Sequence, residues 1–160
     1  MIAVLADTHM PKGGRRLPER CLEIVAGAEA LIHVGDFCRT SVLGELEALC
    51  PTIHAVHGNV DEPALQHLLP QTRELELGNR TVALIHDAGP PPGRLSRLRS
   101  RFPDADAVVF GHSHMPLHEE GDGCQIFNPG SPTERRRAPQ RSMGLLSCKG
   151  GRLSFEHLWL

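Results

Sequence analysis

Five short apolar runs, each followed by a polar residue of a kind that binds metal ions, constrain the fold of this chain most strongly. The runs cover residues 2–6, 30–34, 53–56, 82–85 and 107–110, and the polar residues near their ends are Asp7, Asp36, Asn59, His86 and His112. Short, continuous apolar runs are typical of strands that are buried on both faces. We therefore predict five buried strands that present polar side chains at their carboxyl ends.

Amphipathic segments separate several of these runs. Residues 18–26 and 41–49 place their apolar side chains at helical spacing, and Thr40 or Ser41 is the expected N-cap of the second segment. Strands that alternate with helices build α/β folds, in which ligands bind outside the carboxyl ends of the strands. The polar strand ends, although far apart in the sequence, should therefore converge on one site.

The second half of the chain is richer in predicted strands. Residues 124–127, 143–148 and 153–158 have strand patterns, and Lys149-Gly150-Gly151 is the expected hairpin turn between the last two. The proline-rich segment 87–93 is expected to be a stiff loop and not a linker between domains. With 160 residues and no internal repeat, the chain is expected to form one domain over residues 1–160.

Composition argues against several classes of protein. The formal net charge of -2 gives no general attraction to nucleic acid or an anionic membrane. Aromatic residues make up only 4% of the chain, which leaves few side chains for stacking on bases. No apolar run approaches the roughly 18 residues of a membrane span, and Met1 leads directly into a predicted strand, so we expect a cytoplasmic location. The five cysteines are odd in number and widely spaced, which argues against disulfides and a cysteine zinc site.

The residues after the first two runs have the chemistry of metal ligands. Asp7 and His9 lie two residues apart, so that a carboxylate and an imidazole could reach one ion. Asp36 follows Gly35. Its two carboxylate oxygens can bridge two cations, and the glycine permits a tight turn.

Asn59 and three histidines extend this set. The amide oxygen of Asn59 is a neutral ligand, and its NH2 group could instead donate to a phosphate oxygen. His86, His112 and His114 add imidazoles at two further strand ends. This mixture of nitrogen and oxygen donors suits Mn, Fe, Ni, Zn or Co better than Ca or Mg.

The order of these motifs resembles a known family. D-x-H, G-D, G-N, H and G-H-S-H follow one another at predicted strand ends, as in the calcineurin-like metallophosphoesterase superfamily and, more narrowly, its small phosphodiesterases of the YfcE type. The resemblance runs from Met1 through Asn128-Pro129-Gly130-Ser131 and is less specific after that. It implies an α/β fold with four layers, an α/β/β/α sandwich of two facing mixed β-sheets flanked by helices.

The resemblance also implies a dinuclear metal centre. The first ion would be bound by Asp7, His9 and His114, the second by Asn59, His86 and His112, and Asp36 would bridge the two ions. A hydroxide shared by two ions about 3.5–4 Å apart is then the expected nucleophile for in-line attack on phosphorus, with Asp36 and Asn59 as catalytic residues. Manganese is the expected metal, with Fe, Ni, Zn or Co as alternatives, and activity should fall at acidic pH because protons compete for the histidines.

Two positions depart from the family pattern. Many members have a histidine after Gly-Asn that can protonate the leaving group, where this chain has Val60. This favours substrates with good leaving groups, and nearby Asp61 is expected to be a hydrogen-bond partner behind the ligands and not an acid. Relatives follow the histidine at His86 with glycine, whereas this chain has Asp87.

The leading hypothesis is a metal-dependent phosphodiesterase that acts on a small organic diester or a nucleotide-like compound. Arg135 and Arg136 are candidates for binding the rest of the diester, with a solvated basic face as the alternative. The competing hypotheses are a phosphomonoesterase, a nuclease, and a protein-binding scaffold, since a eukaryotic retromer scaffold subunit shares this fold. The presence of all seven candidate ligands favours an enzyme, because a buried polar cluster is costly to keep. A homo-oligomer stays possible.

Overall fold

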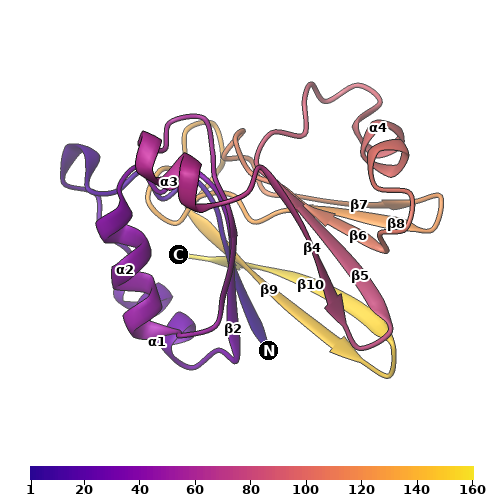
Figure 1. Cartoon of the computed structure of the whole chain (residues 1–160), viewed down its shortest axis with the longest axis horizontal. Helices are drawn as coiled ribbons and strands as arrows, with labels where there is room; N and C mark the ends of the chain where they lie inside the picture. The colour runs from indigo at the N-terminus through magenta and orange to yellow at the C-terminus, as the bar shows by residue number, and fades with distance from the viewer.

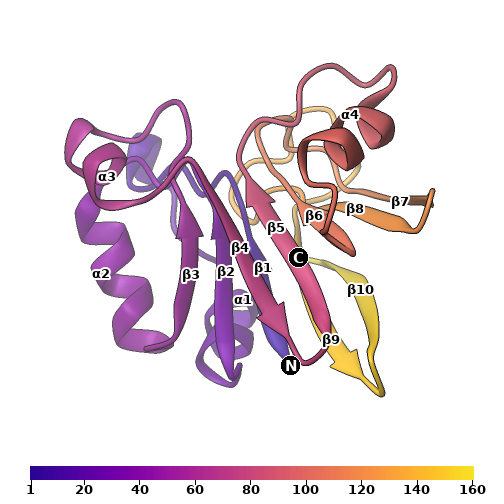
Figure 2. The ribbon, with the colours of Figure 1, turned by 45° about the vertical axis from the view of Figure 1, so that its right-hand side comes forward.

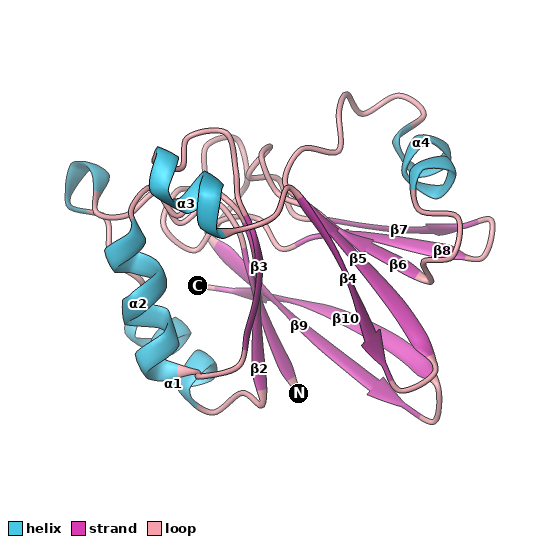
Figure 3. Ribbon diagram, viewed as in Figure 1, coloured by secondary structure: helices cyan, strands magenta, loops and turns pink.

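Ten β-strands form two five-stranded sheets that face each other in the computed structural model, which describes residues 1–160. Helices cover the outer face of each sheet, so the molecule has four layers (Figures 1 and 3). This arrangement confirms the α/β/β/α sandwich that the sequence predicts.

The first sheet contains three parallel strands and a hairpin. Its strands are β1 (Ile2–Leu5), β2 (Ala30–Val34), β3 (Ile53–Val56), β9 (Ser142–Lys149) and β10 (Arg152–Trp159). They lie in the order β10-β9-β1-β2-β3, and β9 pairs antiparallel with β1. The arrows of β2 and β3 point to the same edge of the sheet (Figure 2), so the residues that follow these strands lie together there.

The second sheet is also mixed. Its strands are β4 (Thr72–Leu77), β5 (Arg80–Ile85), β6 (Ala107–Val109), β7 (Leu117–Gly121) and β8 (Cys124–Asn128). They lie in the order β4-β5-β6-β8-β7, with β5, β6 and β8 parallel and an antiparallel strand at each edge. The arrow of β5 points the same way as those of β2 and β3 (Figure 2), which brings the carboxyl ends of both sheets to one side of the molecule.

Four helices and a short 3-10 turn complete the fold. They are α1 (Glu19–Ala26), α2 (Thr40–Leu49), α3 (Pro63–Leu68), α4 (Arg94–Arg101) and the turn Lys12–Gly14. In Figure 1, α1 and α2 cover the first sheet and α4 covers the second. None of these helices combines the length and the hydrophobicity that crossing a membrane requires.

The alternation of side chains along β1 explains how the layers are joined. Ala3 and Leu5 pack with the residues of α1 and α2, whereas Val4 and Ala6 pack in the layer between the two sheets. A third apolar layer lies between the second sheet and α4. Strands that are buried on both faces need continuous apolar sequence, which is why the short runs predicted these strands.

The structure corrects the predicted start of α2. Arg39 occupies the N-cap position without a side-chain cap, and the helix begins at Thr40. The Thr40 hydroxyl donates to Glu62 at 2.8 Å and the Thr40 backbone N–H donates to the same oxygen at 2.6 Å. The Glu62 carboxylate, from a distant loop, therefore caps the helix in place of the Thr40 or Ser41 side chain that the sequence predicts. The hairpin turn is confirmed, because Gly150 and Gly151 have φ values of 56° and 71°.

Candidate metal centre

The loops that follow β1, β2, β5 and β6 are joined by backbone hydrogen bonds. The N–H groups of Asp7 and His9 donate to the carbonyl oxygens of Gly35 and Asp36 at 3.0 and 2.9 Å. The N–H of Gly111 donates to the carbonyl of His86 at 2.9 Å. These contacts fix the polar strand ends relative to one another, as the α/β pattern predicts.

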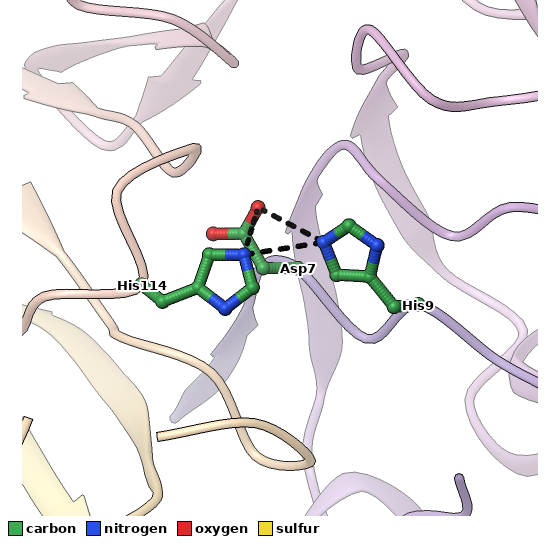
Figure 4. Close-up of side chains that lie close together, drawn as sticks. All are labelled: Asp7, His9 and His114. Atoms are coloured by element: carbon green, nitrogen blue, oxygen red, sulfur yellow. Dashed lines mark hydrogen bonds and ion pairs between the residues drawn. The ribbon is translucent and has the colours of Figure 1, made fainter. Parts of the chain in front are cut away.

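Asp7, His9 and His114 form the first cluster of possible metal ligands (Figure 4). The two imidazoles approach each other through Nε2 atoms 3.2 Å apart. The Asp7 Oδ1 atom lies 3.6 Å from Nε2 of His114 and 3.9 Å from Nε2 of His9. All three residues are buried, and their donor atoms surround one point where an ion could be held.

Asp36, His86 and His112 form the second cluster, and Asn59 completes it. The Oδ1 atom of Asn59 lies 3.0 Å from Nε2 of His86 and 3.0 Å from Nδ1 of His112. His112 is exposed, whereas Asp36 and His86 are buried. The second cluster therefore has an open side toward solvent.

One carboxylate oxygen lies at the border of the two clusters. The Oδ2 atom of Asp36 is 3.5 Å from Nε2 of His9 in the first cluster and 3.3 Å from Nε2 of His86 in the second. The other oxygen, Oδ1, accepts a hydrogen bond from the backbone N–H of Val60 at 3.0 Å. This position suits a carboxylate that bridges two cations.

Strained backbone geometry is concentrated in this set. Positive φ angles between 45° and 68° occur at Asp7, His9, Asp36, His112 and His114. Such conformations cost non-glycine residues roughly 1 kcal/mol or more each and persist where the surroundings enforce them. Strain in five of the seven candidate ligands indicates that these loops are shaped by the site and not by local preference.

Two glycines allow the close approach of the loops. Gly35 has a φ of 90°, and a Cβ there would lie 2.6 Å from the backbone nitrogen of Gly58. A Cβ at Gly58 would overlap the Asp36 carboxylate. The glycines of the G-D and G-N motifs therefore leave room for each other and for Asp36.

Burial controls the protonation of the first cluster. It raises the pKa of Asp7 to about 8. It also lowers the pKa of His9 and lowers the pKa of His114 to about 4, the latter with help from the charge of Arg136. The two imidazoles are thus neutral at pH 7, with lone pairs available to a cation.

The second cluster has the opposite electrostatics. Burial lowers the pKa of His86, but its hydrogen bond to Asp36 and the charges of Asp7 and Asp36 outweigh burial and raise this pKa to about 9. Burial raises the pKa of Asp36, but hydrogen bonds from His86 and Val60 outweigh it and bring the pKa to about 2. A buried cation is thus favoured beside Asp36.

An unsatisfied polar atom tests whether a metal fits this site. The Oδ2 atom of Asp7 is buried and has no hydrogen-bond partner, although leaving a buried carboxylate oxygen unpaired is costly. Neutral imidazoles, carboxylates and an amide oxygen are also the donor types that borderline divalent cations prefer. The residues therefore fit a pair of divalent metal ions.

Residues behind the clusters hold the candidate ligands in place. The Asp61 carboxylate accepts hydrogen bonds from the backbone N–H groups of Asp36, Cys38 and Gly58 at 3.1, 2.7 and 2.7 Å. The expected hydrogen-bonding role of Asp61 is thereby confirmed. His86 Nδ1 lies 2.7 Å from the Val34 carbonyl, which as a donor contact leaves Nε2 free to face the cluster.

The loop after β8 braces the first cluster. Ser131 Oγ donates to the carbonyl of Asp7 at 2.8 Å, and Asn128 Nδ2 donates to the carbonyl of Gly111 at 2.9 Å. Thr133 and Glu134, which the sequence did not single out, also contribute. Thr133 Oγ1 donates to the carbonyl of Thr8 at 2.8 Å, and the Glu134 carbonyl lies 3.3 Å from Nδ1 of His114. Only their position after the N-P-G-S turn could have drawn attention to them.

The remaining candidates differ in their surroundings. Arg135 donates to the carbonyls of Ala138 and Pro139 within its own loop. Arg136 pairs with Glu134 at 3.7 Å and lies close enough to the first cluster for its charge to lower the pKa of Asp7. Asp87 is exposed and accepts from the N–H of Gly89 at 2.7 Å. Among these three residues, Arg136 is the one whose charge acts on the first cluster.

Comparison with known proteins identifies the family. A family model described as the calcineurin-like phosphoesterase superfamily domain matches residues 1–151. The chain belongs to this superfamily. A relative named "Probable metallophosphoesterase", from Methanothermobacter thermautotrophicus, is 33% identical over 98% of the chain and 90% of its own length. Phosphodiesterase YfcE of Escherichia coli is 29% identical over 88% of the chain and 84% of its own length. These matches confirm the resemblance to calcineurin-like and YfcE-type proteins.

The chain is also similar to proteins that are named vacuolar protein sorting 29. Vacuolar protein sorting-associated protein 29 of Schizosaccharomyces pombe is 32% identical over 83% of the chain and 72% of its own length. The solved structure of Vacuolar Protein Sorting 29 from Cryptosporidium parvum has a TM-score of 0.79 and covers 99% of the chain and 97% of its own. At 20% sequence identity, this match shows a shared fold alone.

Proposed function

We propose that the chain is a dinuclear metal-dependent phosphodiesterase that hydrolyses small phosphate diesters. The observation that supports this proposal most strongly is the position of the Asp36 Oδ2 atom, 3.5 Å from His9 in one cluster and 3.3 Å from His86 in the other. Two divalent ions would lower the pKa of water to make a nucleophile and would neutralise the phosphoryl oxygens. Manganese is the proposed metal, and both sheets supply ligands, so the whole chain would act as one domain.

The residues of the chain have separate roles in this proposal. Asp7, His9 and His114 would hold one ion, Asn59, His86 and His112 would hold the other, and Asp36 would bridge them. The NH2 group of Asn59 is not engaged by the contacts of Oδ1, so it could donate to a phosphoryl oxygen. Arg136 would balance the charge of the phosphate beside the first cluster.

A diester is the proposed substrate because of Val60. This side chain is 45% exposed and has no group that could protonate a leaving oxygen. A leaving group that departs as a stable anion needs no such donor, whereas a poor one does. Substrates with good leaving groups are therefore expected to react fastest.

The test is hydrolysis of bis(p-nitrophenyl) phosphate by metal-stripped protein, with and without added Mn. The isosteric variant Asp36→Asn should lose at least a hundredfold in kcat/KM, because removal of a key electrostatic contact costs about that much. Asp104→Asn is the matched control, since Asp104 is exposed in the segment before β6. Its activity should equal that of the wild type.

A protein-binding scaffold of the same fold is the second candidate. The observation in its favour is the similarity to vacuolar protein sorting-associated protein 29. Absence of turnover with Mn, Ni, Co and Zn alike would favour this candidate over the phosphodiesterase. Turnover that disappears in Asp36→Asn would exclude a purely non-catalytic role.

A further inference from the structure

A groove of about 420 Å³ begins at the candidate metal ligand His9 and runs outward along the protein surface. Two of its lining residues contact the clusters: the Sγ atom of Cys38 lies 3.8 Å from Nδ1 of His9, and the Val60 N–H donates to Asp36 at 3.0 Å. Lys12 and Arg39 also line it, and both are exposed. Its volume lies in the range of pockets that hold small molecules. Because His9 belongs to both the first cluster and the groove, the groove offers room beside the clusters for one substituent of a bound phosphate group.

Two of the seven residues that line the groove are apolar. They are Pro11 and Val60, and Val60 exposes 45% of its surface. An exposed apolar side chain beside a charged cluster favours an organic substituent over a bare phosphate oxygen. The position that lacks the family's histidine thus contributes contact area instead.

Most cations around the groove already have partners. Arg39 pairs with Glu62 at 2.9 Å, and Glu62 also accepts from Thr40. Arg15 pairs with Glu134 at 2.7 Å. Lys12 takes part in none of the ion pairs of the structure, so its ammonium group is the uncompensated positive charge of the groove.

The backbone at Lys12 is held in place although its side chain is exposed. Arg15 donates through Nη1 to the carbonyl of Lys12 at 2.8 Å and through Nη2 to Glu134 at 2.7 Å. Glu134 follows the N-P-G-S loop, and its own carbonyl lies 3.3 Å from Nδ1 of His114. This chain of contacts connects the turn Lys12–Gly14 to the first cluster and fixes the origin of the lysine side chain.

We propose that this groove binds the non-leaving substituent of the diester and that Lys12 pairs with a second phosphate group on that substituent. A compact ammonium on a flexible stem is a common phosphate ligand. The substrate class would then be organic diesters that carry a further phosphate, such as nucleoside bisphosphate esters. This inference rests on the proposed function, because the scissile phosphate must first be held at the two clusters.

The test compares two substrates that differ in one phosphate. They are the p-nitrophenyl ester of thymidine 5′-phosphate and the same ester with an additional 3′-phosphate, both followed by release of p-nitrophenolate. We expect the wild-type Mn-loaded protein to prefer the bisphosphate by roughly tenfold in kcat/KM, which is the value of one charged contact. The preference should shrink as salt concentration rises.

Variants of the two lysines test whether Lys12 causes the preference for the bisphosphate ester. Lys12→Gln should bring the ratio of the two kcat/KM values close to one, and Lys12→Arg should keep it. The matched control is Lys149→Gln, because Lys149 is the other lysine of the chain, is exposed and also precedes two glycines. Lys149→Gln should retain the wild-type ratio.

The outcomes separate the two proposals. Hydrolysis of both esters at equal kcat/KM, or a ratio that is unchanged in Lys12→Gln, would overturn the role of the groove while the phosphodiesterase stands. Failure to hydrolyse either ester would remove the proposed function and this inference with it.

Discussion

Asp61 accepts a hydrogen bond at 3.1 Å from the backbone N–H of Asp36, the residue whose side chain borders both metal-ligand clusters. The same Asp61 oxygen accepts from Gly58 at 2.7 Å. The carboxylate thus links the G-D loop to the G-N loop by hydrogen bonds. Its contacts are made entirely with backbone groups, so they position ligands without taking part in chemistry.

Replacement of Asp61 tests this bracing role. Asp61→Asn converts one acceptor oxygen into an NH2 group that faces backbone N–H donors, and loss of such charged hydrogen bonds should lower the free energy of unfolding by about 2–3 kcal/mol. Metal affinity should fall by about 10–100-fold. Urea unfolding of the metal-free protein and calorimetric Mn titration measure the two effects, with Asp104→Asn as the control. Wild-type metal affinity in Asp61→Asn would refute the role.

Metal binding should release protons near neutral pH. Burial raises the pKa of Asp7 to about 8, and the neighbouring carboxylates raise that of His86 to about 9 despite burial. Both groups carry a proton at pH 7 and must lose it to bind a cation, so about two protons should be released there. Metal affinity should rise as pH rises and should level off above the pKa of His86.

Calorimetry in buffers with different enthalpies of ionisation counts these protons. The number of protons released on metal binding should decline as the pH approaches the pKa values of Asp7 and His86. It should be about one lower in Asp7→Asn. A binding enthalpy that is independent of the buffer at pH 7 would contradict the prediction.

Val60→His should broaden the range of substrates. The new imidazole would follow Asn59 and could donate a proton to the leaving oxygen, an effect typically worth about 10²–10⁴-fold when well placed. We expect the rate on diphenyl phosphate to rise at least tenfold relative to bis(p-nitrophenyl) phosphate, whose leaving group needs no acid. Val60→Leu is the control, and an equal change on both substrates would count against the explanation.

Asp106 should stabilise the protein above acidic pH. Burial raises the pKa of Asp106, but hydrogen bonds from the Thr81 backbone N–H at 2.8 Å and from Arg80 at 2.6 Å together outweigh burial and lower this pKa. A lowered pKa means that the stabilisation is present above the unfolded value near pH ~3.9 and is lost as the pH falls through the folded value. Asp106→Asn should therefore cost about 1 kcal/mol at pH 7.

Urea unfolding between neutral and acidic pH checks this dependence. The difference in the free energy of unfolding between wild type and Asp106→Asn should narrow as the pH approaches and passes below about 4. A difference that stays constant over that range would show that the charge of Asp106 is not responsible.

Much of the site was predictable because the candidate ligands come directly after strands of the core. Four of the five runs are buried almost throughout and therefore had to be largely apolar, whereas the fifth, β3, is an edge strand in which Ile53 and His54 are half-buried. The change to Asp7, Asp36 or His112 at the end of a run is then abrupt. In a sheet with parallel strands such changes coincide in space, so the order of motifs predicted the clusters.

The elements that the sequence did not reveal lie at the edges of the sheets or on the surface. β4 and β7 are edge strands with several partly exposed or charged residues, so they lack a clear apolar pattern. In α4, the arginines satisfy backbone carbonyls, as Arg97 does with Ala88 and Pro90 at 2.9 and 2.7 Å. The proposed role of Lys12 could not be predicted either, because it depends on which neighbouring cations already have partners.

Each cluster takes donors from both sheets. Asp7 and His9 follow β1 of the first sheet, whereas their partner His114 follows β6 of the second. In the other cluster, Asp36 comes from the first sheet and His86 from the second. An ion in either cluster would therefore crosslink the two sheets of the sandwich. Loss of the ions would weaken the contact between the two sheets at that edge. A protein of this fold without metal ions would need other contacts to hold the sheets together there.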